Sequence, residues 1–212
     1  SVCADYFMEA PLHSENNQQA ERSIEVLQQL LKTAAEIGVR DIVIPCVDQS
    51  SIKNEQVRTI FIEALTTVIP NAELSGVNLS LETDLNPKQF RELLSSLDSS
   101  KVTVNYDIGN SASLGYNPID ELSAYGERIS DIHIKDRLLD GGSVVLGGGG
   151  QTLDCSSLIC LSCIIKAHLL CKHIVMIKVL MFLCNSLNGL NHICGNNSNS
   201  HVEFSFAKVG CK

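Results

Sequence analysis

Short apolar runs alternate with amphipathic helical patterns along the first 150 residues. The strand-like runs span 1–7, 41–48, 76–84, 102–110 and 129–136. Between them, apolar residues recur every three or four positions, as expected for helices that pack by one face. These helical stretches cover 18–37, 55–68, a segment opened by Pro87, and 118–125. We expect the second helix to stop at Pro70, because proline lacks the N–H that a helix interior uses. The alternation predicts a parallel α/β fold.

Polar residues close the predicted strands. They are Asp48, Glu82, Asp107, and His133 with Lys135. Because the carboxyl ends of parallel strands meet at one edge, we expect Glu82, Asp107 and His133 to lie together there. Two oxygen donors and one nitrogen donor suit a divalent Mn, Mg, Co or Zn ion. Strand-end acids can also cap the following helix, and for Asp48 we favour that simpler role.

Composition narrows the classes of partner. The formal net charge of -8 argues against a protein that binds a nucleic-acid backbone, which needs a basic face. The chain opens on SVCADYFM without a basic segment or a small-residue cleavage site, which predicts a cytoplasmic protein rather than a secreted one. It also opens directly on a strand-like run, so we expect it to begin inside a domain.

Composition changes near residue 150, so we divide the chain into 1–150 and 151–212. The second part holds only two acids, Asp154 and Glu203, but seven of the nine cysteines and four of the six histidines. Its apolar stretch 158–184 follows neither the helical nor the strand period. Three lysines interrupt this stretch, so no membrane span is expected, since a span needs roughly 18 uncharged residues. The single Cys160-x2-Cys163 pair is a weak zinc signal.

Four strings in the first part resemble a known family. SVCADYFMEAPLH, VNLSLETDL, VNYDIGNSASLGYNP and AYGERISDIHIKDR are similar to the xylose isomerase-like TIM-barrel superfamily. Within it, they resemble most the sugar phosphate isomerase/epimerase branch, near the hexulose-phosphate isomerases. The resemblance implies an incomplete (β/α)8 TIM barrel, in which the present strands are the third to the seventh and helices flank them. It also implies that the first two βα units of the barrel are missing.

The resemblance also implies a chemistry. Glu82, Asp107 and His133 match three metal ligands of the family, whose metal helps to move a proton next to the carbonyl of a sugar or sugar phosphate through an enediolate. Glu82 also matches a proton-transfer carboxylate. Asn110, Lys135 and Arg137 are candidates for binding substrate hydroxyls or phosphate, Arg137 because its fork suits phosphate. A strand-end salt bridge is the alternative for each of these three.

Two other functions stay open at this point. The chain could be a catalytically inactive α/β fragment that binds metal weakly or not at all. It could also resemble the endonuclease IV-like abasic-site nucleases of the same superfamily. That interpretation is disfavoured, because those enzymes use a richer histidine cluster and residues 1–150 contain only His13 and His133.

The glycine run 147–150 in VVLGGGGQTLDC predicts a loop after the seventh barrel strand. A phosphate-binding role is weakened, because no helix suited to hold an anion follows it. Beyond the run, the family pattern is lost. It returns if the gene is translated one base out of register, because the possible codons then allow ADF followed by KGxFxLQ(T/A). We therefore expect residues from about 151 onward to be out-of-frame translation. The recovered strand-eight residue would be Gln rather than Glu, which departs from the family's two-carboxylate epimerases.

Overall fold

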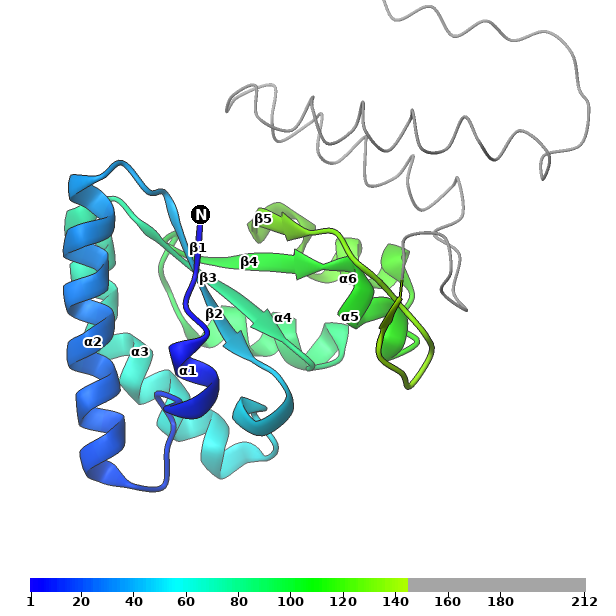
Figure 1. Cartoon of the computed structure of the whole chain (residues 1–212), viewed down its shortest axis with the longest axis horizontal. Coiled ribbons are helices and arrows are strands. Elements are labelled where there is room, and N and C mark those ends of the chain that lie inside the picture. Colours follow the sequence, from blue (N-terminus) through cyan, green and yellow to red (C-terminus); the bar gives the residue numbers. More distant parts are fainter. Residues whose placement is uncertain (145–212) are drawn as a thin grey trace, which may run out of the picture. The chain divides into compact units, whose positions relative to one another are not determined.

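Five parallel strands form one sheet in the order β1-β2-β3-β4-β5 (Figure 1). The structure, a computed structural model of the whole chain, describes residues 1–144. The strands are β1 (Val2–Cys3), β2 (Asp41–Cys46), β3 (Asn78–Thr83), β4 (Val102–Asp107) and β5 (Ile129–His133). A separate antiparallel pair follows, β6 (Asp136–Arg137) with β7 (Ser143–Val144). The main sheet confirms the predicted parallel α/β arrangement, whereas the small hairpin was not predicted.

Helices connect the strands (Figure 1). They are α1 (Tyr6–Glu9), α2 (Asn17–Glu36), α3 (Glu55–Ser75), α4 (Pro87–Ser96), α5 (Ile108–Ser113) and α6 (Pro118–Tyr125), with the 3-10 turns η1 (Asp48–Ser50) and η2 (Gly126–Arg128). Four of the helices begin after an asparagine whose side chain accepts a backbone N–H of the first turn: Asn16, Asn54, Asn86 and Asn117. Such caps satisfy amides that the helix itself leaves unpaired. None of the helices within residues 1–144 is long and apolar enough to cross a membrane.

The two faces of the sheet differ in polarity. Side chains alternate along a strand, so residues two apart share a face. On one face, strand residues join the helices in a continuous core: Ile42, Ile44, Leu79, Leu81, Val102 and Val104 from the sheet, with Leu27, Leu31, Phe61, Leu65 and Leu93 from the helices. The opposite face of β3 and β4 carries Ser80, Glu82, Thr103, Asn105 and Asp107, which are buried as well. The helices therefore stabilise one face and leave the other for polar chemistry.

Pro70 does not end the second predicted helix, and this prediction was wrong. α3 continues to Ser75, with Pro70 inside it. Apolar residues on both sides of the proline, including Val68 and Ala72, are fully buried, so packing holds the helix together. The helix ends at Gly76, whose φ of 73° is left-handed.

All five predicted strands are shorter in the structure, and two of them run into an α-helix. In 1–7, only Val2–Cys3 pairs with β2, and the chain then turns into α1, which buries Phe7. In 102–110, β4 ends at Asp107 and the next residues begin α5. The cause at the second position is Asp107 itself, because its side chain accepts the N–H of Asn110 and starts the helix.

All of the described residues belong to one compact unit. The predictions for the glycine loop 147–150, the stretch 158–184, the Cys160–Cys163 pair and the out-of-frame translation concern residues outside 1–144.

Candidate metal centre

Glu82, Asp107 and His133 lie together at the carboxyl ends of three neighbouring strands. Each contributes a ligand atom, and these atoms lie within 4.8 Å of one another. The Nδ1 atom of His133 is 3.2 Å from Glu82 Oε2 and 3.8 Å from Asp107 Oδ2. The structure thus brings together the three residues that strand spacing selected.

A register shift between β4 and β5 places His133 on this face. Val104 is paired with Ile129, but the next residue of β4, Asn105, is paired with Asp131. The extra residue, Ser130, is a β-bulge, and the shift makes His133 the partner of Asp107. Without the extra residue His133 would move by one position and point to the helix side, since side chains alternate.

Asp107 uses its two carboxylate oxygens differently. Oδ1 accepts the backbone N–H of Asn110 at 2.9 Å and so caps α5. Oδ2 faces His133 and lies 2.7 Å from the ammonium group of Lys135. The capping role that we considered for strand-end acids therefore applies to Asp107, and it leaves Oδ2 to face positive charge, here that of Lys135.

Glu82 is held by two side-chain amides. Asn110 donates from Nδ2 to Oε1 at 2.7 Å, and Asn105 donates from Nδ2 to Oε2 at 2.8 Å. The same Asn105 nitrogen lies 3.0 Å from His133 Nδ1. Glu82 is only 6% exposed and Asn105 only 2% exposed, so these contacts fix a carboxylate that solvent hardly reaches.

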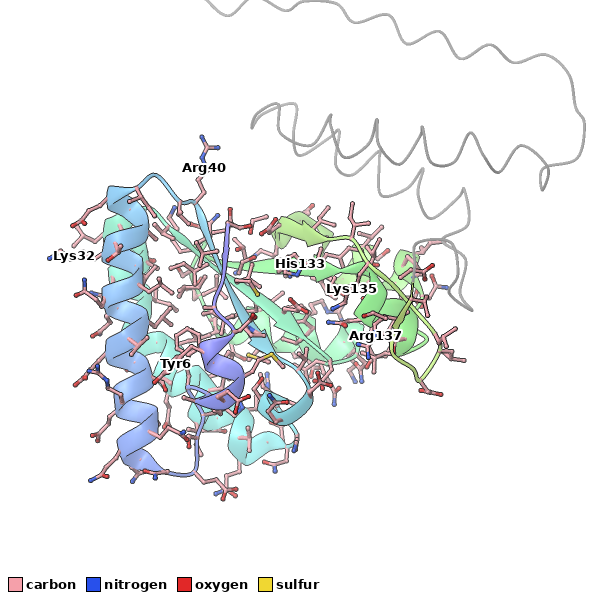
Figure 2. All side chains as sticks on the ribbon, in the orientation of Figure 1. Tyr6, Lys32, Arg40, His133, Lys135 and Arg137 are labelled. Carbon is pink, nitrogen blue, oxygen red and sulfur yellow. The ribbon has the colours of Figure 1, made fainter. Side chains whose placement is uncertain are left out.

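Lys135 and Arg137 follow His133 along the chain (Figure 2). Besides the contact of Lys135 with Asp107, Arg137 donates from Nη1 to Asn110 Oδ1 at 2.7 Å and from Nε to Gly141 O at 3.0 Å. The six residues predicted from sequence thus form one connected network. In this network Asn110, Lys135 and Arg137 contact other site residues, and their predicted binding of substrate remains a prediction.

The charges of the group shift its pKa values. Burial alone would raise the pKa of Glu82, but the hydrogen bond and charge of His133 outweigh burial, so this pKa is lowered. Burial and the negative charge of Glu82 raise the pKa of Asp107, against the hydrogen bonds from Lys135 and from the Asn110 backbone. The hydrogen bond to Glu82 raises the pKa of His133. Glu82 is therefore stabilised as an anion, whereas the hydrogen bonds to Asp107 do not fully offset the cost of burying its negative charge.

These residues fit a divalent metal ion. Two ligand atoms each about 2.1 Å from one ion lie about 3.0–3.4 Å apart at octahedral or tetrahedral angles. The separation of His133 Nδ1 and Glu82 Oε2, 3.2 Å, falls in this range, and that of Nδ1 and Asp107 Oδ2, 3.8 Å, is slightly larger. A nitrogen and two carboxylate oxygens suit Mn²⁺, Co²⁺ or Zn²⁺.

Two other polar residues near the sheet do not join the group. Asp48 has an exposed side chain in η1 and a φ of 52°, and it lies outside the group of three. His13, the second histidine of residues 1–144, is buried edge-on against Phe61. Within these residues, Glu82, Asp107 and His133 are the only group suited to a metal.

Asn105 is the residue of the centre that sequence reasoning missed. It lies in the run VTVNYD, two positions before Asp107, so strand alternation puts both on the same face. A polar residue inside an otherwise apolar buried strand was the available signal.

The chain belongs to the xylose isomerase-like TIM barrel family, whose family model matches residues 2–157. The five-stranded sheet with its flanking helices is accordingly an incomplete (β/α)8 barrel. This confirms the family and the fold class that the motifs predicted.

The chain also has a curated relative that is an epimerase. It is 31% identical over 129 residues to a 2-epi-5-epi-valiolone 7-phosphate 2-epimerase from an Actinoplanes strain, an alignment that covers 59% of this chain and 47% of the relative. The chain thus spans about half the length of that curated relative.

Solved structures show the same fold. The D-allulose 3-epimerase of a Methylomonas species has a TM-score of 0.61 at 16% identity, over 73% of this chain and 57% of that one. The IolI protein with a bound zinc atom has a TM-score of 0.60 at 21% identity, over 72% and 59%. At these identities the likeness concerns the fold alone.

Proposed function

We propose that this chain carries the metal centre of a divalent-metal-dependent isomerase or epimerase acting on a sugar or sugar phosphate. The observation that supports this most is the convergence of Glu82, Asp107 and His133 at the carboxyl ends of three strands, the edge where barrel enzymes place their chemistry. The proteins named above include epimerases of 2-epi-5-epi-valiolone 7-phosphate and of D-allulose, and one of the solved structures contains a bound zinc atom.

Glu82, Asp107 and His133 would hold the ion. When bound, it would act as a Lewis acid that polarises the substrate carbonyl and stabilises negative charge on its oxygen. The lowered pKa of Glu82 keeps this carboxylate ionised at neutral pH, which both metal binding and proton acceptance require.

Glu82 would take the proton from the carbon next to the carbonyl. The electron pair of the broken C–H bond moves into the carbonyl, which gives an enediolate. Return of the proton by Glu82 to the neighbouring carbon gives the isomer. The epimer forms instead when a second acid, such as a water molecule, gives a proton to the opposite face of the same carbon while Glu82 releases its proton to solvent. Lys135 and Arg137 provide positive charge beside the centre, where the phosphate or hydroxyl groups of the substrate would bind.

Proton exchange with solvent tests this function. The chain is incubated with MnCl₂ and a panel of ketoses and ketose phosphates in D₂O, and loss of the C–H signal next to the carbonyl is followed by proton NMR. We expect exchange that falls by about 10²–10⁴-fold in Glu82→Gln, the usual contribution of a general base. Glu92→Gln is the matched control, because Glu92 is exposed on α4. Equal exchange in both variants would refute the role of Glu82.

A second candidate is a metal-binding α/β part without turnover. It is favoured by the open sheet, in which β1 and β5 each have one neighbour among the described strands, whereas a (β/α)8 barrel is closed. Metal binding without exchange would support it. A longer gene product, translated in the alternative frame after residue 150, discriminates the two candidates if exchange appears only there.

A further inference from the structure

Asn105 lies beside the candidate metal ligands Glu82, Asp107 and His133, on the same face of the sheet, but is not one of them. It shares its face of β4 with Asp107, two residues on, and its side chain points at Glu82 and His133. Its Nδ2 atom is within hydrogen-bond distance of one atom from each of them, at 2.8 and 3.0 Å. These two atoms, Glu82 Oε2 and His133 Nδ1, are the pair that lies 3.2 Å apart.

The amide donates to a buried carboxylate but leaves its own oxygen unpaired. Asn105 is 2% exposed, and its Oδ1 has no hydrogen-bond partner within the described residues. Burying an unsatisfied polar atom costs free energy, whereas an apolar residue of similar shape would avoid that cost. The strand positions on the other face, such as Val104 and Val102, are apolar and fully buried. The contacts of Nδ2 therefore give the better explanation of an amide at this position.

An amide is suited to hold a metal-binding carboxylate. Asn105 and Asn110 together fix both oxygens of Glu82, each through a neutral N–H donor. A lysine or arginine at either position would also fix the carboxylate, but its positive charge would compete with the ion. Neutral donors leave the full negative charge of Glu82 available, and outer partners of this kind orient metal ligands.

We infer that Asn105 is a positioning residue that holds Glu82 in the orientation that binds the metal ion beside His133. This inference rests on the proposed function and deepens it. Asn105 acts through Glu82, so its loss lowers metal affinity rather than removing a ligand. Loss of such an outer partner typically weakens metal affinity by about 10- to 100-fold.

Calorimetric titration with MnCl₂ tests the inference on the full chain. Asn105→Leu removes the amide and keeps the branched shape of the side chain with larger methyl groups, and Asn105→Ser is a second, smaller variant whose short hydroxyl does not reach Glu82. Thr103→Val is the matched control, because Thr103 lies on the same strand and face and hydrogen-bonds Ser130 rather than a ligand. Unfolding of each metal-free variant is measured in parallel, together with the visible absorption of bound Co²⁺.

We expect both Asn105 variants to bind Mn²⁺ about 10- to 100-fold more weakly and to shift the Co²⁺ absorption bands. Their metal-free forms should lose some stability, because Glu82 loses a donor, but should still unfold in one cooperative transition. The Mn²⁺ affinity of Thr103→Val should stay within about twofold of the original. Unchanged affinity in either Asn105 variant would overturn the inference. So would a loss of affinity that only accompanies a loss of the metal-free fold. Absence of Mn²⁺ binding by the unsubstituted chain would instead overturn the metal centre itself.

Discussion

Gly109 allows α5 and the segment after β5 to approach each other closely. A Cβ atom added at Gly109 would lie 2.5 Å from Lys135 Cγ and 2.7 Å from the carbonyl oxygen of Lys135. The second contact involves backbone, so a side-chain rotation cannot relieve it. In Gly109→Ala the two segments must therefore separate. Both carry site residues, because Asn110 follows Gly109 directly and Lys135 follows His133 by two positions.

The magnitude follows from two opposing effects. In a helix, replacing Gly by Ala normally stabilises by about 0.5–1 kcal/mol. Overpacking in a close contact costs about 1–3 kcal/mol. With a backbone contact this short, we expect overpacking to dominate and Gly109→Ala to lose about 1–2 kcal/mol in free energy of unfolding. For a domain of this size, that corresponds to a fall in Tm of roughly 2–8 °C.

Urea unfolding of the metal-free chain and Mn²⁺ titration are the assays. Gly126→Ala is the control, because a Cβ there would meet Leu122 at 3.7 Å, an ordinary contact, and the backbone has a helical φ of -55°. We expect the control to keep its stability and Mn²⁺ affinity, while Gly109→Ala loses stability and binds Mn²⁺ more weakly. If Gly109→Ala is as stable as the control, the close approach of Lys135 to α5 is wrong.

Two further predictions concern charged side chains. Lys135→Met should tighten Mn²⁺ binding by about two- to fivefold, because the ammonium group then no longer pairs with Asp107. The gain is limited because the ammonium group is half-exposed, and such pairs contribute at most about 1 kcal/mol. Weaker binding in calorimetry would contradict this prediction. Burial raises the pKa of Glu121 above its ordinary 4.5, although Ser111, Tyr125 and Tyr106 donate to its carboxylate. The stability gained from this proton is complete below pH 4.5 and is lost as pH rises through the raised pKa. The stability of the original chain relative to Glu121→Gln should therefore fall as the pH rises above 4.5, by at most about 1.4 kcal/mol per pH unit. Urea unfolding that shows the opposite trend would refute this prediction.

The strand–helix alternation of the sequence was sufficient to predict the sheet. Each buried strand is a short apolar run with a polar end, and the order of elements restricts the sheet to a parallel one. Element ends were less predictable, because tertiary packing decides them. Pro70 is tolerated inside α3, since buried residues on both sides hold the helix. At Asp107, a side-chain cap converts the end of a predicted strand into a helix.

The grouping of the three candidate metal ligands could be predicted because they are ionisable residues at strand ends, but their supporting contacts could not. Spacing along the chain gives the order of the strands, not their register. Nothing in the sequence ISDIH indicates that Ser130 is an extra residue in the pairing with β4. The partners of Glu82 could not be foreseen either. Asn110 was expected to bind substrate, yet its amide lies between Glu82 and Arg137.

The polar face of the sheet links register, hydrogen bonding and chemistry. Barrel interiors are usually filled by branched apolar side chains, but here hydroxyl groups occupy the layer below the centre. Ser130 donates to Thr103 at 2.7 Å and lies 3.2 Å from Ser80, so β3, β4 and β5 are connected across this face. The bulge that supplies Ser130 to this layer is the one that pairs His133 with Asp107. Ser130, which connects the three strands across this face, is thus also the extra residue whose presence pairs His133 with Asp107.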